Sequence, residues 1–249
     1  MSRNCRIAFT LSVLTFAAKN AATAGISVLF IGNSLTYTND LPAVFKQFSA
    51  ASSLHLDVEV RSITPGGATL FDHWKHEQAL SLLRAYHPKF LILQGQSTEP
   101  LSATENFNYY ARLFKMEADQ VDAKTVLFST WARPATDSYY KDPSSGGSPF
   151  EMQTRLNAAY LALATNIKAT LAPIGIAWQR AEQVAPKIEL LDGSQHPSPA
   201  GTYLAAAVLF RAVFNASPVG STYYGGLPEP SAHTLQRIAD HASTAVPEL

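Results

Sequence analysis

Short apolar runs alternate with longer stretches of helical periodicity along this 249-residue chain. Four apolar runs are typical of strands buried on both faces, and a fifth stretch alternates between apolar and polar residues as half-buried strands do. The predicted strands cover residues 26–31, 54–61, 90–93, 125–129 and 174–178. Helical spacing predicts helices over residues 41–52, 69–86, 107–121, 151–171, 199–214 and 232–243.

Strand–helix units that repeat in this order predict an α/β fold, with one five-stranded parallel sheet covered by helices on both faces. In such a three-layer sandwich, ligands bind beyond the carboxyl ends of the strands. Residues 134–149 are polar and rich in Gly, Pro and Ser, which is typical of a loop that borders a site. Candidate functional residues are therefore sought where strands end.

The first 24 residues have the pattern of a secretory signal. Arg3 and Arg6 precede an apolar run over residues 7–18, and Ala22-Thr23-Ala24 supplies small residues for cleavage. The run is about 12 residues long, short of the ~20 that a membrane-spanning helix needs. We expect export to the periplasm or the medium, with residues 25–249 forming a single domain, and an uncleaved anchor as the alternative. No later segment predicts a membrane span.

The charge and the cysteine content exclude several classes of partner and of catalytic chemistry. Lys and Arg together number 19, as do Asp and Glu, so the net charge is zero. A nucleic-acid partner, which needs an excess of positive charge on one face, is not expected. The single cysteine, Cys5, lies in the predicted signal, so the mature domain has no thiol to serve as nucleophile, disulfide or zinc ligand. We expect no metal and no cofactor.

Four segments at or near predicted strand ends carry the candidate chemistry: Gly32-Asn33-Ser34, Gly66-Gly67, Gln94-Gly95-Gln96-Ser97 and Asp192-Gly193-Ser194-Gln195-His196. A serine in a turn after a buried strand is held exposed above the sheet, which suits Ser34 as a nucleophile. His196 is a base able to take the serine proton near neutral pH. Asp192 is the candidate for orienting the imidazole, and the Gly67 N–H has no Cβ to obstruct a substrate.

At these residues the chain resembles the SGNH (GDSL) hydrolase superfamily. Gly32-Asn33-Ser34-Leu35-Thr36 is similar to its Gly-Asp-Ser-Leu block, Gly67-Ala68-Thr69 to its glycine block, and His196-Pro197-Ser198 to its C-terminal Asp-x-x-His block. The resemblance implies a flavodoxin-like α/β/α fold and metal-free ester hydrolysis by serine. It also implies an oxyanion hole formed by the N–H groups of Ser34 and Gly67 and by an amide side chain of the third segment.

The chain departs from the family pattern at three points. Asn33 stands where the family usually has Asp. The third segment lacks the family's Asn, so Gln96 is the nearest amide donor, with Gln94 and Ser97 as rivals. This segment is similar to the Gln-Gly-Glu-Ser found in some carbohydrate acetylesterases. The acid lies four residues before the histidine instead of three, so either Asp192 or a backbone carbonyl orients His196.

Four residues near these segments are candidates for contacting substrate: Asn33, Gln94, Trp131 and Arg133. Trp131 and Arg133 follow the fourth strand, where they either line a pocket or serve as core residue and surface charge. The expected function is a serine esterase that removes O-acyl groups, most simply acetyl, from a carbohydrate. The alternatives are an esterase for lipid or aryl esters and a glycan-binding protein without catalysis on the same fold. The sequence leaves the oligomeric state open.

Overall fold

The computed structural model of the protein describes residues 25–242. The predicted signal, residues 1–24, lies outside the described residues, as do residues 243–249. Five parallel strands form one sheet in the order β2-β1-β3-β4-β5. Their bounds are Ile26–Ile31 (β1), Val58–Ile63 (β2), Phe90–Leu93 (β3), Lys124–Phe128 (β4) and Thr170–Ala172 (β5). The predicted α/β fold with a five-stranded parallel sheet is confirmed.

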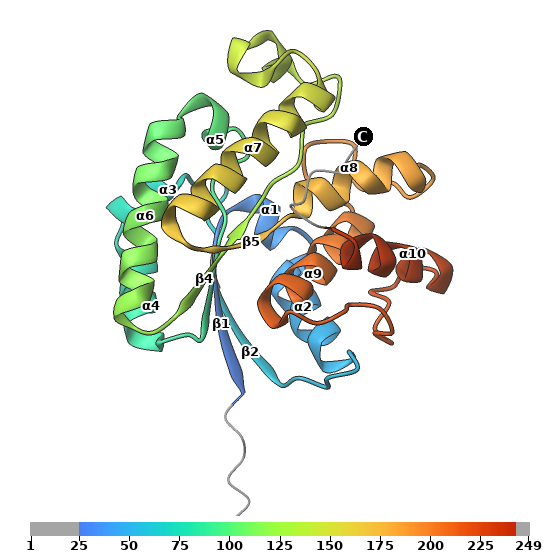
Figure 1. The fold of residues 1–249 in the computed structure, drawn as a ribbon, viewed down its shortest axis with the longest axis horizontal. Helices are drawn as coiled ribbons and strands as arrows, with labels where there is room; N and C mark the ends of the chain where they lie inside the picture. The colour runs from blue at the N-terminus through green and yellow to red at the C-terminus, as the bar shows by residue number, and fades with distance from the viewer. Residues whose placement is uncertain (1–24, 243–249) are drawn as a thin grey trace, which may run out of the picture.

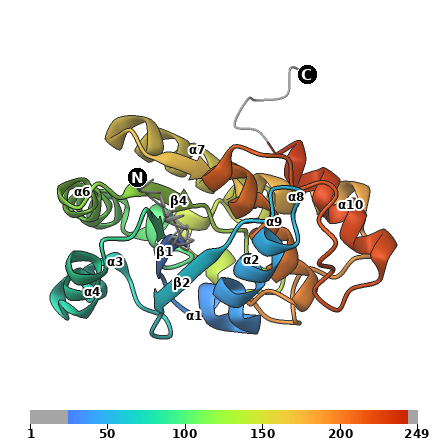
Figure 2. The same cartoon turned by 90° about the horizontal axis from the view of Figure 1, so that it is seen from below.

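Helices cover both faces of the sheet (Figures 1 and 2). One layer consists of α2 (Leu41–Ala50), α8 (Ile174–Val184), α9 (Pro199–Phe214) and α10 (Glu229–Asp240). The other consists of α3 (Leu70–Lys75), α4 (Gln78–Tyr86), α6 (Thr104–Gln120) and α7 (Pro149–Ile167). Side chains along a strand point alternately to the two faces. Val28 and Phe30 of β1 therefore pack in the first layer's core, while Leu29 and Ile31 pack in the second.

Short helical turns occupy the loops at the carboxyl edge of the sheet and in the long polar segment. They are α1 (Ser34–Tyr37), η1 (Thr38–Asp40), α5 (Glu99–Ser102), η2 (Ser138–Lys141) and η3 (Pro143–Ser145). No helix within residues 25–242 is both long enough and apolar enough to cross a membrane.

The predicted strand over residues 174–178 is wrong. The fifth strand is the three-residue β5, and the chain enters α8 at Ile174. β5 lies at an edge of the sheet and begins with the exposed Thr170, so it has no apolar run that would reveal it. The run from Ile174 is apolar because one face of α8 is buried, and Ala177, Trp178 and Ala181 continue that face at helical spacing.

Two predicted helices differ from the structure at turns that non-glycine residues make. The helix predicted over residues 69–86 is divided into α3 and α4 at Glu77, whose φ is 55°. The helix predicted over residues 151–171 ends at Ile167, because Lys168 takes a φ of 55° and leads into β5. Only a few per cent of non-glycine residues adopt this left-handed conformation, so residue type does not indicate these breaks.

We predict that Gly201→Ala destabilises the fold. Gly201 lies in the first turn of α9, and a Cβ there would overlap the Leu190 carbonyl and the Trp178 ring. Overpacking of this kind typically costs about 1–3 kcal/mol, which lowers the melting temperature by roughly 3–10 °C at this chain length. Thermal unfolding followed by circular dichroism measures the shift.

Gly66→Ala is the matched control for this substitution. Its Cβ would lie 3.5 Å from the Tyr37 hydroxyl, which is ordinary contact, and Gly66 is not in the left-handed region. An equal loss of melting temperature in both variants would contradict the overlap argument.

Candidate active site

The four predicted segments meet at the carboxyl edge of the sheet. Ser34 is the first residue of α1, three residues after β1, and His196 comes from the loop that precedes α9. The Oγ of Ser34 lies 3.0 Å from Nε2 of His196, although 162 residues separate them in sequence. This contact places a hydroxyl and an imidazole in the geometry that nucleophile activation by a general base requires.

Asn33 and Gln94 form a buried network directly beneath Ser34. Asn33 Nδ2 donates to the Ala68 carbonyl at 3.0 Å, and its Oδ1 accepts from the Leu35 N–H at 3.2 Å and from Gln94 Nε2 at 3.0 Å. Gln94 Oε1 in turn accepts from the Asn33 N–H at 3.0 Å and from the Thr36 hydroxyl at 2.9 Å. Both side chains are buried. The polar groups of these two candidates for substrate contact are thus used within the protein.

Ser34 and Gly67 each present a backbone N–H that has no acceptor among residues 25–242. Ser34 owes this to its place at the start of a helix, where the first N–H groups lack partners within the helix. Gly67 has a φ of 70°, a conformation that favours glycine, and its Cα faces open space. These are the two backbone groups that the family resemblance assigns to an oxyanion hole.

The amide of Gln96 has one fixed orientation. Its Oε1 accepts from the N–H of Thr98 at 2.7 Å, the hydroxyl of Thr98 at 2.9 Å and the N–H of Glu99 at 3.1 Å. With the oxygen turned to these donors, Nε2 points the other way, and it has no acceptor in the described part of the chain. Gln96 is thus the third-segment amide with a free donor, whereas the Gln94 donor is used in the buried network.

Glu99 connects the second and third segments. Its buried carboxylate accepts from the N–H of Gln96 at 3.0 Å and from the N–H of Leu70, the first residue of α3, at 3.3 Å. Burial raises the pKa of Glu99, and the two N–H groups oppose this by stabilising the charged form. The sequence does not single out Glu99, because its partner Leu70 lies 29 residues away on another segment.

The loop that carries His196 is closed as a short hairpin. The Asp192 N–H donates to the His196 carbonyl at 3.1 Å, and the Ser198 N–H donates to the Leu190 carbonyl at 2.8 Å. Gly193, with a φ of 94°, lets the chain turn at the tip. The backbone of the hairpin thus fixes the position of the imidazole.

Three side chains hold this hairpin against the rest of the site. Asn39 Nδ2 donates to the Pro197 carbonyl at 2.9 Å, and Trp131 Nε1 donates to the Gln195 carbonyl at 3.1 Å. Arg133 donates to the Gln195 side-chain oxygen at 2.7 Å. Asn39 lies just after α1 and has a φ of 54°, and such backbone strain is often found at functional sites. The histidine hairpin is therefore held by the segment that follows Ser34, through Asn39, and by the segment that follows β4, through Trp131 and Arg133.

Asp192 does not meet His196 directly. Both residues are described, and no hydrogen bond joins the carboxylate to the imidazole. The Asp192 carboxylate instead accepts from the N–H of Ser194 at 2.9 Å and from its hydroxyl at 2.6 Å. Nδ1 of His196 lies 3.1 Å from that same hydroxyl oxygen. Among the described residues, the hydrogen-bond partner of Nδ1 is neither the Asp192 carboxylate nor a backbone carbonyl but the Ser194 hydroxyl, which lies between the acid and the base.

Of the two interpretations of Trp131 and Arg133, Trp131 is a core residue, whereas Arg133 lines a pocket with its guanidinium hydrogen-bonded within the protein. The Trp131 ring is buried and stacked on Trp178, with ring centres 4.0 Å apart and an interplanar angle of 7°. Arg133 donates to the Asp137 carboxylate at 3.1 Å and to the Ser97 hydroxyl at 3.0 Å. Because Asp137 balances the guanidinium charge, Arg133 is not a free site for an anion.

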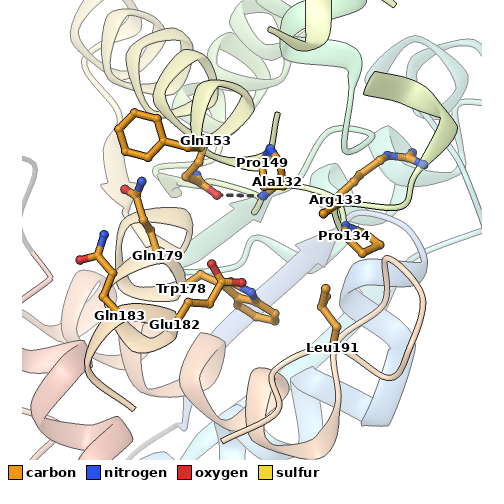
Figure 3. A pocket seen from close by; sticks show the side chains of 12 residues that line it. Ala132, Arg133, Pro134, Pro149, Gln153, Trp178, Gln179, Glu182, Gln183 and Leu191 are labelled. Atoms are coloured by element: carbon orange, nitrogen blue, oxygen red, sulfur yellow. Dashed lines mark hydrogen bonds between the residues drawn. The ribbon is translucent and has the colours of Figure 1, made fainter. Parts of the chain in front are cut away.

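A pocket of about 420 Å³ borders the histidine loop (Figure 3). It lies between α7, α8 and the segment after β4, and Leu191 at the start of the histidine loop also lines it, whereas Ser34 and His196 are not among its lining residues. Its polar lining consists mainly of carboxamides and one acid: Gln153, Gln179, Gln183 and Glu182. Phe150, which is 63% exposed, adds an aromatic ring. Burial raises the pKa of Glu182.

His73 is a further residue that the sequence analysis did not place in the site. It is buried on α3, and its Nε2 lies 2.7 Å from the carbonyl of Gly32, two residues before Ser34. A carbonyl only accepts, so Nε2 carries the proton and donates. Within residues 25–242, no group of three or more His, Cys, Asp or Glu side chains is placed to hold a metal ion.

Solved structures share this fold. No protein-family model matches the chain, and no curated protein matches it in sequence. A protein from Slackia heliotrinireducens, proposed to be an SGNH hydrolase, is 27% identical, with a TM-score of 0.62 over 76% of this chain and 99% of that one. A DUF4886 family protein from Bacteroides uniformis is 17% identical, with a TM-score of 0.76 over 88% and 94%. A mutant of Axe2, an acetylxylan esterase from Geobacillus stearothermophilus, is 14% identical, with a TM-score of 0.58 over 76% and 94%.

These neighbours confirm the resemblance to the SGNH hydrolases. The chain has their fold, and its four candidate segments lie at the carboxyl edge of the parallel sheet.

We predict that His73 makes the fold less stable as the pH falls. Burial lowers its pKa below the ordinary 6.5, while the hydrogen bond to Gly32 and the nearby Asp72 oppose this. Below about pH 6.5 the unfolded chain therefore binds a proton that native His73 refuses, so acidification favours unfolding. His73→Gln keeps an N–H donor for Gly32 and cannot titrate.

Chemical denaturation from about pH 7.5 to about pH 5 compares the two proteins. The free energy of unfolding of the parent should fall more steeply than that of His73→Gln, and titrating groups that do not interact with His73 cancel in the difference. Parallel curves would show that His73 titrates normally.

Proposed function

We propose that this SGNH-type serine ester hydrolase removes O-acetyl groups from a carbohydrate, with Ser34 as nucleophile and His196 as general base. The observation that carries the proposal is the 3.0 Å contact between Ser34 Oγ and His196 Nε2. The same contact argues against a protein that only binds glycans, because binding does not require a base beside a serine.

The reaction follows from the positions of these groups. Ser34 Oγ attacks the ester carbonyl carbon while its proton passes to Nε2 of His196. The carbonyl oxygen becomes negative and accepts from the N–H groups of Ser34 and Gly67 and from Nε2 of Gln96. When the intermediate collapses, the proton on His196 goes to the departing sugar oxygen, and the acyl group stays on Ser34. Water then attacks the acyl-enzyme with His196 again as base, and acetate leaves.

The pocket beside the histidine loop supports a carbohydrate as the leaving group. Carboxamide side chains such as Gln179 and Gln183 both donate and accept, as sugar hydroxyls do. An exposed ring such as Phe150 offers an apolar face to a pyranose. Axe2, an acetylxylan esterase, shares the fold, and the predicted export of this chain fits an extracellular or periplasmic glycan.

Ser34→Ala is predicted to abolish ester hydrolysis. Without the hydroxyl no acyl-enzyme forms, so kcat for p-nitrophenyl acetate should fall at least about 10³-fold, and labelling by a fluorophosphonate probe should disappear. Ser81→Ala, at an exposed serine of α4, is the control and should behave like the parent. Labelling or turnover that survives in Ser34→Ala would refute the assignment of the nucleophile.

The substrate class is tested with a panel of esters. Acetate release from acetylated xylan and other acetylated glycans should exceed release from short-chain and long-chain aryl esters at equal concentration. Preference for long-chain esters, with no glycan deacetylated, would instead favour a lipid or aryl esterase.

Phe150→Ala is predicted to weaken glycan binding without changing the chemistry. Loss of one aromatic contact should raise KM for an acetylated oligosaccharide roughly two- to tenfold, while kcat stays constant. Ethyl acetate, which has no sugar to place in the pocket, should be hydrolysed as by the parent. Tyr109→Ala removes a similarly exposed ring outside the pocket and serves as control. An unchanged KM for the glycan would exclude this pocket as its binding site.

A further inference from the structure

We infer that Ser194 is a positioning residue that transmits the effect of Asp192 to the imidazole of His196. The inference rests on the proposed function, since it concerns the base of that reaction. Ser194 lies between the acid and the histidine of the fourth segment, and the resemblance assigns it no role. It lies at the tip of the hairpin, and its Oγ is within hydrogen-bond distance of both neighbours, at 2.6 Å from Asp192 Oδ1 and 3.1 Å from His196 Nδ1.

The direction of each hydrogen bond follows from the donors and acceptors available. A hydroxyl has one proton to donate and two lone pairs that accept. The Asp192 carboxylate only accepts, and the N–H and hydroxyl of Ser194 keep it charged by lowering its pKa. The one proton of Ser194 therefore points to Asp192. The backbone N–H of His196 donates to the first lone pair of Ser194 at 3.1 Å, and the second is left to accept from Nδ1–H.

This assignment determines the tautomer of His196. Because Nδ1 carries the ring proton, Nε2 has a free lone pair directed at the Ser34 hydroxyl, 3.0 Å away. In the opposite tautomer, the lone pair of Nδ1 would face the Ser194 oxygen, whose proton is already donated to Asp192. When His196 accepts the proton of Ser34, the Nδ1–H of the imidazolium still has Ser194 as acceptor, and Ser194 remains polarised by Asp192. No proton leaves Ser194 at any step.

A second Asp-x-Ser turn in the chain shows what is particular to Ser194. Asp142 accepts from the N–H of Ser144 at 2.8 Å and from its hydroxyl at 2.7 Å, in the same arrangement. That turn has no imidazole beside its hydroxyl; the Ser144 hydroxyl instead lies 2.8 Å from the Tyr139 hydroxyl of the same loop. It provides a matched control, because Ser144→Ala removes the same turn hydrogen bonds outside the site.

A double-mutant cycle on esterase activity tests the coupling. Ser194→Ala should lower kcat by at least about tenfold with KM nearly constant, because orientation of the base matters only once the substrate is bound. Asp192→Asn should lower kcat in the parent but change it by less than about twofold in Ser194→Ala, because its effect passes through the missing hydroxyl. Ser194→Thr should restore much of the loss, and Ser144→Ala should match the parent. Asp192 and Ser194 are solvent-exposed and Ser144 lies in a loop, so folding of the variants is checked by melting temperature alone.

A measurement without turnover separates this inference from the proposed function. Nitrogen-15 NMR of the His196 ring should show a protonated Nδ1 and an unprotonated Nε2 in the parent, and a mixture of tautomers in Ser194→Ala. Equal losses from Asp192→Asn in both backgrounds, or an Nε2–H tautomer in the parent, would overturn the role of Ser194 while leaving Ser34 as nucleophile. If the parent showed the expected tautomer but hydrolysed none of the esters, the proposed function would be overturned instead.

Discussion

The side-chain amide of Asn33 is the constraint on which the rest of the site depends. Its Nδ2 donates to carbonyls from the second and third segments, Ala68 at 3.0 Å and Gly95 at 3.5 Å, while its Oδ1 accepts from Leu35 and Gln94. One residue thus joins the ends of three strands and caps the helix that begins with Ser34. One oxygen of an aspartate here could accept from Leu35 and Gln94 as Oδ1 of Asn33 does. Its second oxygen would face the Ala68 and Gly95 carbonyls, and an ionised carboxylate has no proton to donate to them. At a buried position this loss is expensive, which explains why the neutral amide suits this chain.

The base is held by a separate set of contacts that converge on the same point. Asn39 and Trp131 donate to carbonyls of the histidine hairpin, and Arg133 contacts the side chain between them. Trp131 is in turn stacked on Trp178, whose ring also limits the size of residue 201. The Ser34–His196 distance is therefore set by core packing and buried hydrogen bonds, and little reorganisation is needed before reaction. Residues first considered as substrate contacts are the supports of this geometry.

Features that depend on a local pattern of residues could be predicted from the sequence, whereas features that depend on side-chain orientation or on contacts between segments could not. Buried runs revealed β1, β3 and β4 because their side chains are apolar on both faces. β5 was misplaced, since an exposed edge strand of three residues leaves almost no pattern. Ser34 and His196 were recognised through their segments, each a local sequence feature after or before a regular element. The role of Glu99 depends on Leu70, which lies on another segment. Gln96 and Ser194 have partners within three residues, but no periodicity encodes which way an amide or a hydroxyl points.

The extra residue between Asp192 and His196 explains the position of Ser194. The hairpin ties the two residues through their backbones, so the carboxylate folds back onto the turn and the added hydroxyl fills the path to the imidazole. Asp192 is exposed, and two unit charges about 4 Å apart interact by only about 1 kcal/mol in water. Charge alone therefore contributes little to stabilising an imidazolium here. What the Asp192–Ser194 pair supplies is direction: it uses the hydroxyl proton, assigns the ring proton to Nδ1, and leaves the lone pair of Nε2 facing Ser34.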